Sequence, residues 1–101
     1  MTDPSTFAGY RVLVAGASRG IGLAIADAFA RRGAGVAICA RNPGDLADAA
    51  EQLLRHGHPV ARLTCDLADP AQIQQWVAHA AGALGGIDVM VNNASGYGHG
   101  D

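Results

Sequence analysis

A glycine-rich segment near the start of the chain has the spacing needed to hold a phosphate group. Gly16 and Gly20 are separated by three residues, and Gly22 follows after one more. Side chains in such a turn would hold an anion away, whereas glycine lets backbone N–H groups approach a pyrophosphate. The spacing indicates a dinucleotide-binding loop, although a tight turn between a strand and a helix would also use glycines.

Four short apolar runs predict the strands that position this loop. They cover residues 12–15, 36–40, 60–65 and 87–91. Each run is near-continuous rather than alternating, which is typical of strands covered on both faces. The glycine-rich segment directly follows the first run, where a strand must turn into a helix.

Helical patterns fill the intervals between the strands, because apolar residues recur at spacings of three and four. Asn42 and Asp69 each precede a proline and are predicted to cap a helix, and Gln72 stands three residues after Asp69 as in a capping box. The order β-α-β-α-β-α-β predicts an α/β fold with a parallel sheet. The predicted stripes are Ile21, Ala24, Ile25, Ala28 and Phe29; Leu46, Ala49, Ala50, Leu53 and Leu54; and Ile73, Trp76, Val77, Ala80 and Leu84.

Composition excludes several classes of protein. The net charge is −2, and the acids and bases are interleaved, so we expect neither nucleic acid nor a membrane surface as a partner. No apolar run approaches the roughly 20 residues of a membrane span, and residues 1–10 lack the pattern of a signal peptide. We therefore predict a cytoplasmic protein.

The cysteines and histidines suggest no metal site. Cys39 and Cys65 lie within apolar runs, which favours buried, reduced thiols over a disulfide or redox pair. His56 and His58 flank a glycine, which is typical of a solvated loop rather than of a preorganised set of ligands.

Four separated segments together resemble the short-chain dehydrogenase/reductase family. They are the glycine spacing, Arg41 after the second run, Cys65-Asp66-Leu67 at the end of the third, and Asn92-Asn93-Ala94-Ser95 after the fourth. Ala15 stands where the family usually has threonine, and Ser95 where it usually has glycine. The resemblance implies a partial Rossmann-type doubly wound sheet with strand order 3-2-1-4. Residues 1–101 would form a single NAD(P)-binding domain that is incomplete at its carboxyl-terminal end.

The resemblance also implies a nicotinamide dinucleotide cofactor. Ala40 stands where NAD-dependent members have the acid that bonds the ribose 2′-OH, and Arg41 follows it. Arg19 is similar to the second basic residue of NADP-preferring members, so we expect NADP(H) to be preferred over NAD(H). The alternative is that Arg41 is a solvated residue at a strand end. Within the loop, the expected cofactor-binding residues are Gly16, Ser18, Arg19, Gly20, Ile21 and Gly22.

The segments after the last two strands are expected to contact the adenosine half of the cofactor. By resemblance, Asp66 accepts a hydrogen bond from the adenine amino group, beside the backbone of Leu67. Asn93, Ala94 and Ser95 would line the ribose. For Asp66 the alternative is stabilisation of a local turn, since a strand-end carboxylate commonly has that role.

The sequence contains no lysine, and this excludes the family's catalytic pair of a tyrosine and a lysine four residues later. We therefore predict no catalytic residue within the chain and negligible turnover by it alone. The leading hypothesis is the cofactor-binding portion of a reductase that is truncated, split or ordered only this far. When complete, it would act on a carbonyl or alcohol and form a homo-oligomer. Two alternatives remain open, a non-catalytic nucleotide-binding or interaction protein and a remnant without a ligand.

Overall fold

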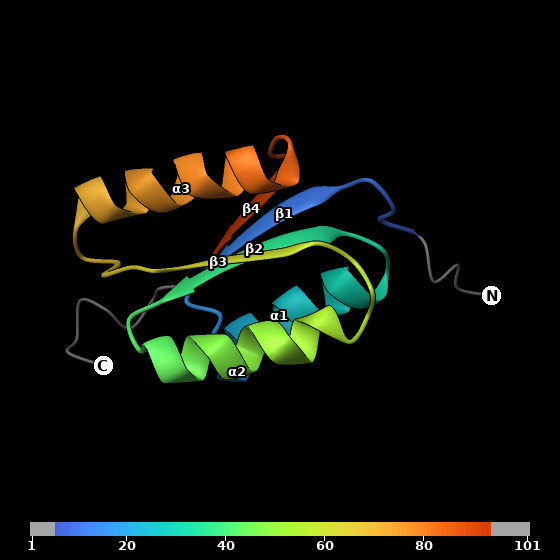
Figure 1. The fold of residues 1–101 in the computed structure, drawn as a ribbon, viewed down its shortest axis with the longest axis horizontal. Helices are drawn as coiled ribbons and strands as arrows, with labels where there is room; N and C mark the ends of the chain where they lie inside the picture. Colours follow the sequence, from blue (N-terminus) through green and yellow to red (C-terminus); the bar gives the residue numbers. More distant parts are fainter. Residues whose placement is uncertain (1–5, 94–101) are drawn as a thin grey trace.

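The structure, a computed structural model, describes residues 6–93 of the 101-residue chain. In this part of the chain four strands alternate with three helices, and the predicted order β-α-β-α-β-α-β is confirmed (Figure 1). The largest shift from a predicted boundary is at the last strand, which begins two residues later than expected. The elements are β1 (Arg11–Ala15), α1 (Gly20–Arg31), β2 (Gly35–Ala40), α2 (Pro43–Leu54), β3 (Val60–Thr64), α3 (Pro70–Leu84) and β4 (Val89–Asn92).

The strands form one parallel sheet in the order β3-β2-β1-β4, which confirms the predicted order. At the centre, Val12 of β1 pairs with Val36 of β2 on one side and with Val89 of β4 on the other. Because all four strands run in the same direction, their carboxyl ends lie along one edge of the sheet. The predicted site segments follow those ends and therefore gather at that edge.

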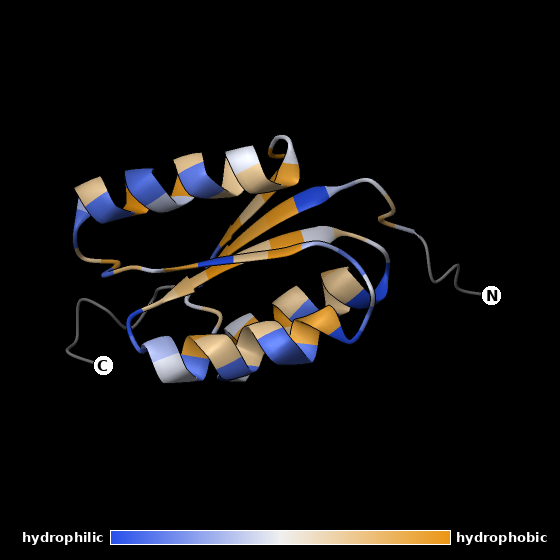
Figure 2. Cartoon of the chain, viewed as in Figure 1, coloured by the Kyte–Doolittle hydropathy of each residue, from blue (hydrophilic) through white to orange (hydrophobic). Residues whose placement is uncertain are grey.

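Helices cover both faces of the sheet, with α1 and α2 on one face and α3 on the other (Figure 1). Val12 and Val14 pack toward α1 and α2, whereas Leu13 between them packs toward α3, and none of the three is exposed. Figure 2 shows the strands mostly in hydrophobic colours, while the helices carry both kinds of residue. Burial on both faces accounts for the near-continuous apolar runs. No helix among residues 6–93 has the length and apolar character needed to cross a membrane.

The face of α1 that packs most closely on the sheet is rotated from the predicted apolar stripe, of which Ile25 and Phe29 pack, partly buried, against the core. Ile21 is 72% exposed and Ala24 is also exposed, although both belong to the predicted stripe. The buried positions are Gly22, Ala26 and Ala30. These small residues let the helix backbone approach the sheet closely, so the approach distance, rather than hydrophobicity alone, sets the rotation of the helix.

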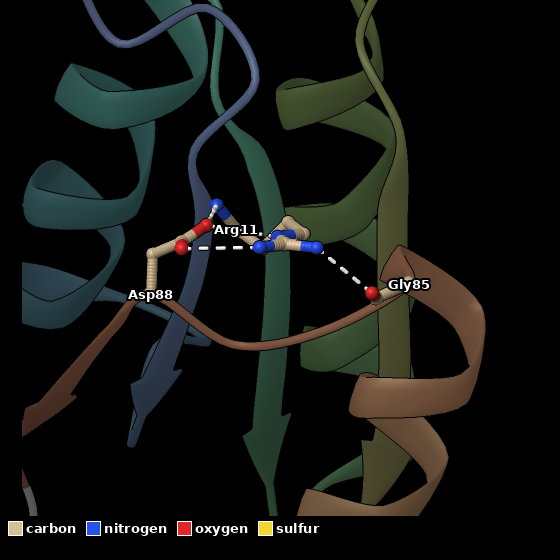
Figure 3. A network of polar contacts seen from close by, with 3 residues as sticks. All are labelled: Arg11, Gly85 and Asp88. Carbon is tan, nitrogen blue, oxygen red and sulfur yellow. Dashed lines mark hydrogen bonds and ion pairs between the residues drawn. The ribbon is translucent and has the colours of Figure 1, made fainter.

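An ionic contact holds the start of β4 against β1 (Figure 3). Arg11 donates to Asp88 from Nε and from its backbone N–H, both 2.8 Å from Oδ2, and from Nη2, 3.1 Å from Oδ1. Its Nη1 donates to the carbonyl of Gly85, at the end of α3, at 2.8 Å. The hydrogen bonds from Arg11 lower the pKa of the Asp88 carboxyl. Oδ2 of Asp88 thus accepts the backbone N–H of Arg11 directly before β4, which begins at Val89 rather than at residue 87.

β4 lies at an edge of the sheet formed by residues 6–93, as the predicted strand order 3-2-1-4 implies. Within this part of the chain, α3 packs across β3, β2 and β1 but not across β4. Met90, the pairing neighbour of the fully buried Leu13, is consequently 50% exposed.

Candidate functional site

The glycine-rich loop between β1 and α1 is anchored by the ends of both neighbouring strands. The backbone N–H groups of Gly16 and Ala17 donate to the Cys39 carbonyl oxygen, at 3.0 and 3.3 Å. From the other side, the Asn93 N–H donates to the carbonyl of Ala15 at 3.1 Å. Gly16 has a φ of +75°, which other residues rarely adopt. The path of the loop therefore depends on glycine at this position and on β2 and β4.

Gly22 in the first turn of α1 lies directly against this loop. A Cβ at Gly22 would be 2.1 Å from the Gly16 carbonyl oxygen and 2.7 Å from Nδ2 of Asn93. That amide nitrogen donates to the same carbonyl oxygen at 3.3 Å. A Cβ at Gly16 would be 2.9 Å from the Asn93 carbonyl oxygen and 3.7 Å from Cδ1 of Leu67. The structure thus brings together Gly16, Gly22, Leu67 and Asn93, which come from three distant parts of the sequence.

The N-terminus of α1 differs from those of the other two helices in the described part of the chain. Asn42 caps α2 and Asp69 caps α3, each by accepting a backbone N–H through its side chain. At α1 the cap residue is Arg19, which makes no such bond. A Cβ at Gly20 would meet nothing within 4 Å, so the space beside this turn is open. Uncapped N–H groups facing open space can bind an anion, and the residues present therefore fit a pyrophosphate.

Positive charge borders this end of the sheet. Arg19 precedes α1 and Arg41 directly follows β2, and both are exposed. Ala40, which stands at the position of the NAD-specific acid, is only 6% exposed and brings no carboxylate. Ser18 is half-buried in the loop, whereas Ile21 presents its apolar side chain to solvent beside it.

Asp66 follows β3 and stabilises the turn that leads to α3. Its Oδ1 accepts the N–H of Ala68 at 3.0 Å, and its own N–H donates to Oε1 of Gln72 at 2.7 Å. The alternative role considered for Asp66, stabilisation of a local turn, is therefore present. It does not conflict with ligand binding, because a carboxylate has about four acceptor positions.

Gln72 does not form the predicted capping box. In a capping box, this side chain would accept the N–H of the cap residue Asp69. That N–H instead donates to the Asp66 carbonyl at 3.0 Å, and Gln72 reaches back to the Asp66 N–H. The turn that precedes the helix already satisfies the cap residue, which frees Gln72 to contact a predicted site residue. The capping-box pattern did not predict this contact, for which the spacing of Asp66, Asp69 and Gln72 was the available signal.

Several other predicted positions lie away from this cluster or outside the described residues. Ala94 and Ser95, expected to line the ribose, are outside them. His56 is not a solvated loop residue, because it is half-buried and its Nε2 lies 2.7 Å from Oδ1 of Asp27 in α1. Among residues 6–93, no three His, Cys, Asp or Glu side chains lie close enough together to hold a metal ion.

The two cysteines are free and buried, as predicted. Burial raises the pKa of the Cys39 thiol to about 12 and also raises the pKa of Cys65. Both side chains are therefore protonated thiols at neutral pH. This state suits a packing role beneath the loop rather than nucleophilic chemistry.

Known proteins match both the sequence and the fold. Residues 10–101 match the sequence profile of the family described as short chain dehydrogenase. A 1-deoxy-11-beta-hydroxypentalenate dehydrogenase from Streptomyces avermitilis is 42% identical over 92 residues, which are 91% of this chain and 32% of that protein. Among solved structures, L-sorbose reductase from Gluconobacter frateurii, in complex with NADPH and L-sorbose, has a TM-score of 0.85 and 36% identity, covering 92% of this chain and 35% of its own.

A second solved structure, of an actinorhodin polyketide ketoreductase variant with NADPH, has a TM-score of 0.78 and 37% identity. The match covers 82% of this chain and 32% of that one. The chain spans 32% to 36% of the length of the first three curated relatives that it matches. The similarity therefore concerns about a third of each relative.

Proposed function

The chain belongs to the short chain dehydrogenase family, and from this premise we propose that it forms the NADP(H)-binding portion of an oxidoreductase. The complete enzyme would transfer hydride between NADPH and a carbonyl or alcohol substrate. The observation that carries the proposal is the packing of Gly22 against Gly16 and Asn93, beside the uncapped N-terminus of α1. This helix end has no side-chain cap, and a Cβ at Gly20 would meet nothing within 4 Å, so the space beside its N–H groups is open.

The chain's own residues would bind and orient the cofactor, and bound NADPH would supply the hydride. The first turn of α1 would hold the pyrophosphate through its N–H groups. Asp66 would accept a hydrogen bond from the adenine amino group, and Asn93 would contact the adjoining ribose. The exposed Ile21 at the same turn offers an apolar surface to the nucleotide.

Three observations support NADP(H) over NAD(H). Arg19 and Arg41 are exposed at the carboxyl edge of the sheet, and Ala40 brings no carboxylate that would repel a 2′-phosphate. Guanidinium groups bind phosphate through charge-assisted and bidentate hydrogen bonds. The two similar structures described above also contain NADPH.

The test is to measure the dissociation constants of NADPH and NADH for the purified protein and for Arg41→Ala. An exposed charge contact contributes about 1 kcal/mol, so we expect the variant to bind NADPH about fivefold more weakly and to bind NADH within twofold of the unmodified protein. Arg55→Ala is the matched control, since it removes an exposed arginine at the end of α2, at the opposite edge of the sheet. It should leave both constants unchanged.

Two results would contradict the proposal at different levels. Absence of saturable binding for either nucleotide would reject a dinucleotide site. Equal affinities for NADPH and NADH that Arg41→Ala does not change would reject only the preference for NADP(H).

A further inference from the structure

Gln72, in the first turn of α3, joins two acidic residues of the turn that follows β3. Its Oε1 accepts the backbone N–H of Asp66 at 2.7 Å, and its Nε2 donates to Oδ2 of Asp69 at 3.1 Å. The side chain is half-buried. A single amide thus connects the helix cap to the residue that we propose as the adenine acceptor.

The partners allow only one orientation of this amide. Its carbonyl oxygen must face the Asp66 N–H, which is a donor, and its NH₂ must face the Asp69 carboxylate, which is an acceptor. The other oxygen of Asp69 accepts the N–H of Ala71 at 3.0 Å, so this carboxylate is itself held by the helix. Gln72 therefore ties the backbone of Asp66 to a rigid element.

The side chain and the backbone carbonyl of Asp66 are restrained as well. Its Oδ1 accepts the N–H of Ala68 at 3.0 Å, and its backbone carbonyl accepts the N–H of Asp69 at 3.0 Å. The next residue, Leu67, lies against Gly16 in the glycine-rich loop. The turn thus holds the Asp66 carboxylate in a defined orientation, and the residue that follows it contacts the glycine-rich loop.

We propose that Gln72 is a positioning residue that makes the site selective for a purine with an amino group at carbon 6. The inference rests on the proposed function, in which Asp66 accepts a hydrogen bond from adenine. A 6-amino group donates to a carboxylate, whereas the 6-oxo group of hypoxanthine is an acceptor and opposes it. This discrimination requires a carboxylate held in one place. Gln72 fixes the backbone that carries the carboxylate, and the Ala68 N–H fixes its Oδ1.

The experiment compares the dissociation constants of NADPH and of its hypoxanthine analogue, in which oxygen replaces the 6-amino group. A hydrogen bond to a charged acceptor corresponds to a factor of about ten or more in affinity, so we expect at least tenfold selectivity for NADPH. In Gln72→Ala the selectivity should fall to within about threefold. Because both ligands are measured on the same preparation, a partial loss of folded protein cancels from the ratio.

Two further variants separate positioning from helix stability. Gln75→Ala makes the same change at an exposed position of the same helix and should keep the full selectivity. Gln72→Glu replaces the Nε2 donor with an oxygen that would face the Asp69 carboxylate, so this variant should lose selectivity as Gln72→Ala does, although glutamate is a good helix former. Circular dichroism of each variant measures its folded content.

The outcomes separate the inference from the proposed function. Selectivity that survives in Gln72→Ala, or that is lost equally in Gln75→Ala, would overturn the role of Gln72 and leave the nucleotide site intact. Tight binding of NADPH with no selectivity in the unmodified protein would overturn the adenine contact of Asp66 and the inference with it. Failure to bind any dinucleotide would instead reject the proposed function.

Discussion

Replacing Gly22 with alanine is expected to disrupt the glycine-rich loop. The new Cβ would lie 2.1 Å from the Gly16 carbonyl oxygen and 2.7 Å from Nδ2 of Asn93, whereas ordinary contacts begin at 3.4 Å. The nearer atom belongs to the backbone and cannot rotate away. The loop and α1 must therefore separate by more than 1 Å, although the Cys39 carbonyl holds the start of the loop.

The size of the effect follows from two opposing contributions. Overpacking a well-packed site costs about 1–3 kcal/mol or more, whereas alanine in place of glycine within a helix contributes about 1 kcal/mol in the other direction. The contact at Gly22 is severe and involves backbone, so we expect a net loss of about 2 kcal/mol. For a chain of this size, that lowers the melting temperature by roughly 10 °C.

The measurement is thermal or urea unfolding followed by circular dichroism, together with titration of NADPH. Gly82→Ala is the matched control, because Gly82 lies within α3 and a Cβ there would meet nothing within 4 Å. That variant should be more stable than the unmodified protein by about 0.5–1 kcal/mol and should bind NADPH normally. If Gly22→Ala were stabilised to the same extent and bound NADPH with unchanged affinity, the close approach of α1 to the loop would be refuted.

Three further predictions concern the rest of the fold. The hydrogen bonds from Arg11 lower the pKa of Asp88, so their contribution to stability is complete above the unfolded carboxyl pKa of about 3.9 and disappears as the pH falls through the lower folded pKa. In Asp88→Asn, the free energy of unfolding measured between pH 2 and 6 should lack this pH-dependent contribution. Burial keeps the thiols of Cys39 and Cys65 protonated, so mass spectrometry after treatment with iodoacetamide at pH 8 should find them unmodified in folded protein and alkylated after denaturation. Asn42→Ala removes the cap of α2 and should lower the free energy of unfolding by about 1 kcal/mol in a urea titration.

The type and order of the elements could be predicted from the sequence because their signals are local. Buried strands require near-continuous apolar runs, and helix caps require particular residues within one turn, as at Asn42 and Asp69. The glycine spacing is equally local, since a single strand-to-helix turn contains it. These signals sufficed to predict a parallel sheet with a glycine-rich turn at its carboxyl edge.

The tertiary structure alone decided which atoms meet at that edge. The rotation of α1 depends on how closely Gly22 approaches Gly16, and its apolar stripe does not show this. The reach of Gln72 to Asp66 depends on a preceding turn that already satisfies the helix cap. Both are distances between separate elements, and a one-dimensional pattern of residue types does not contain such distances. Sequence thus determined which groups follow which strand, whereas packing determined which of them touch, because contact depends on the separation of backbones in space.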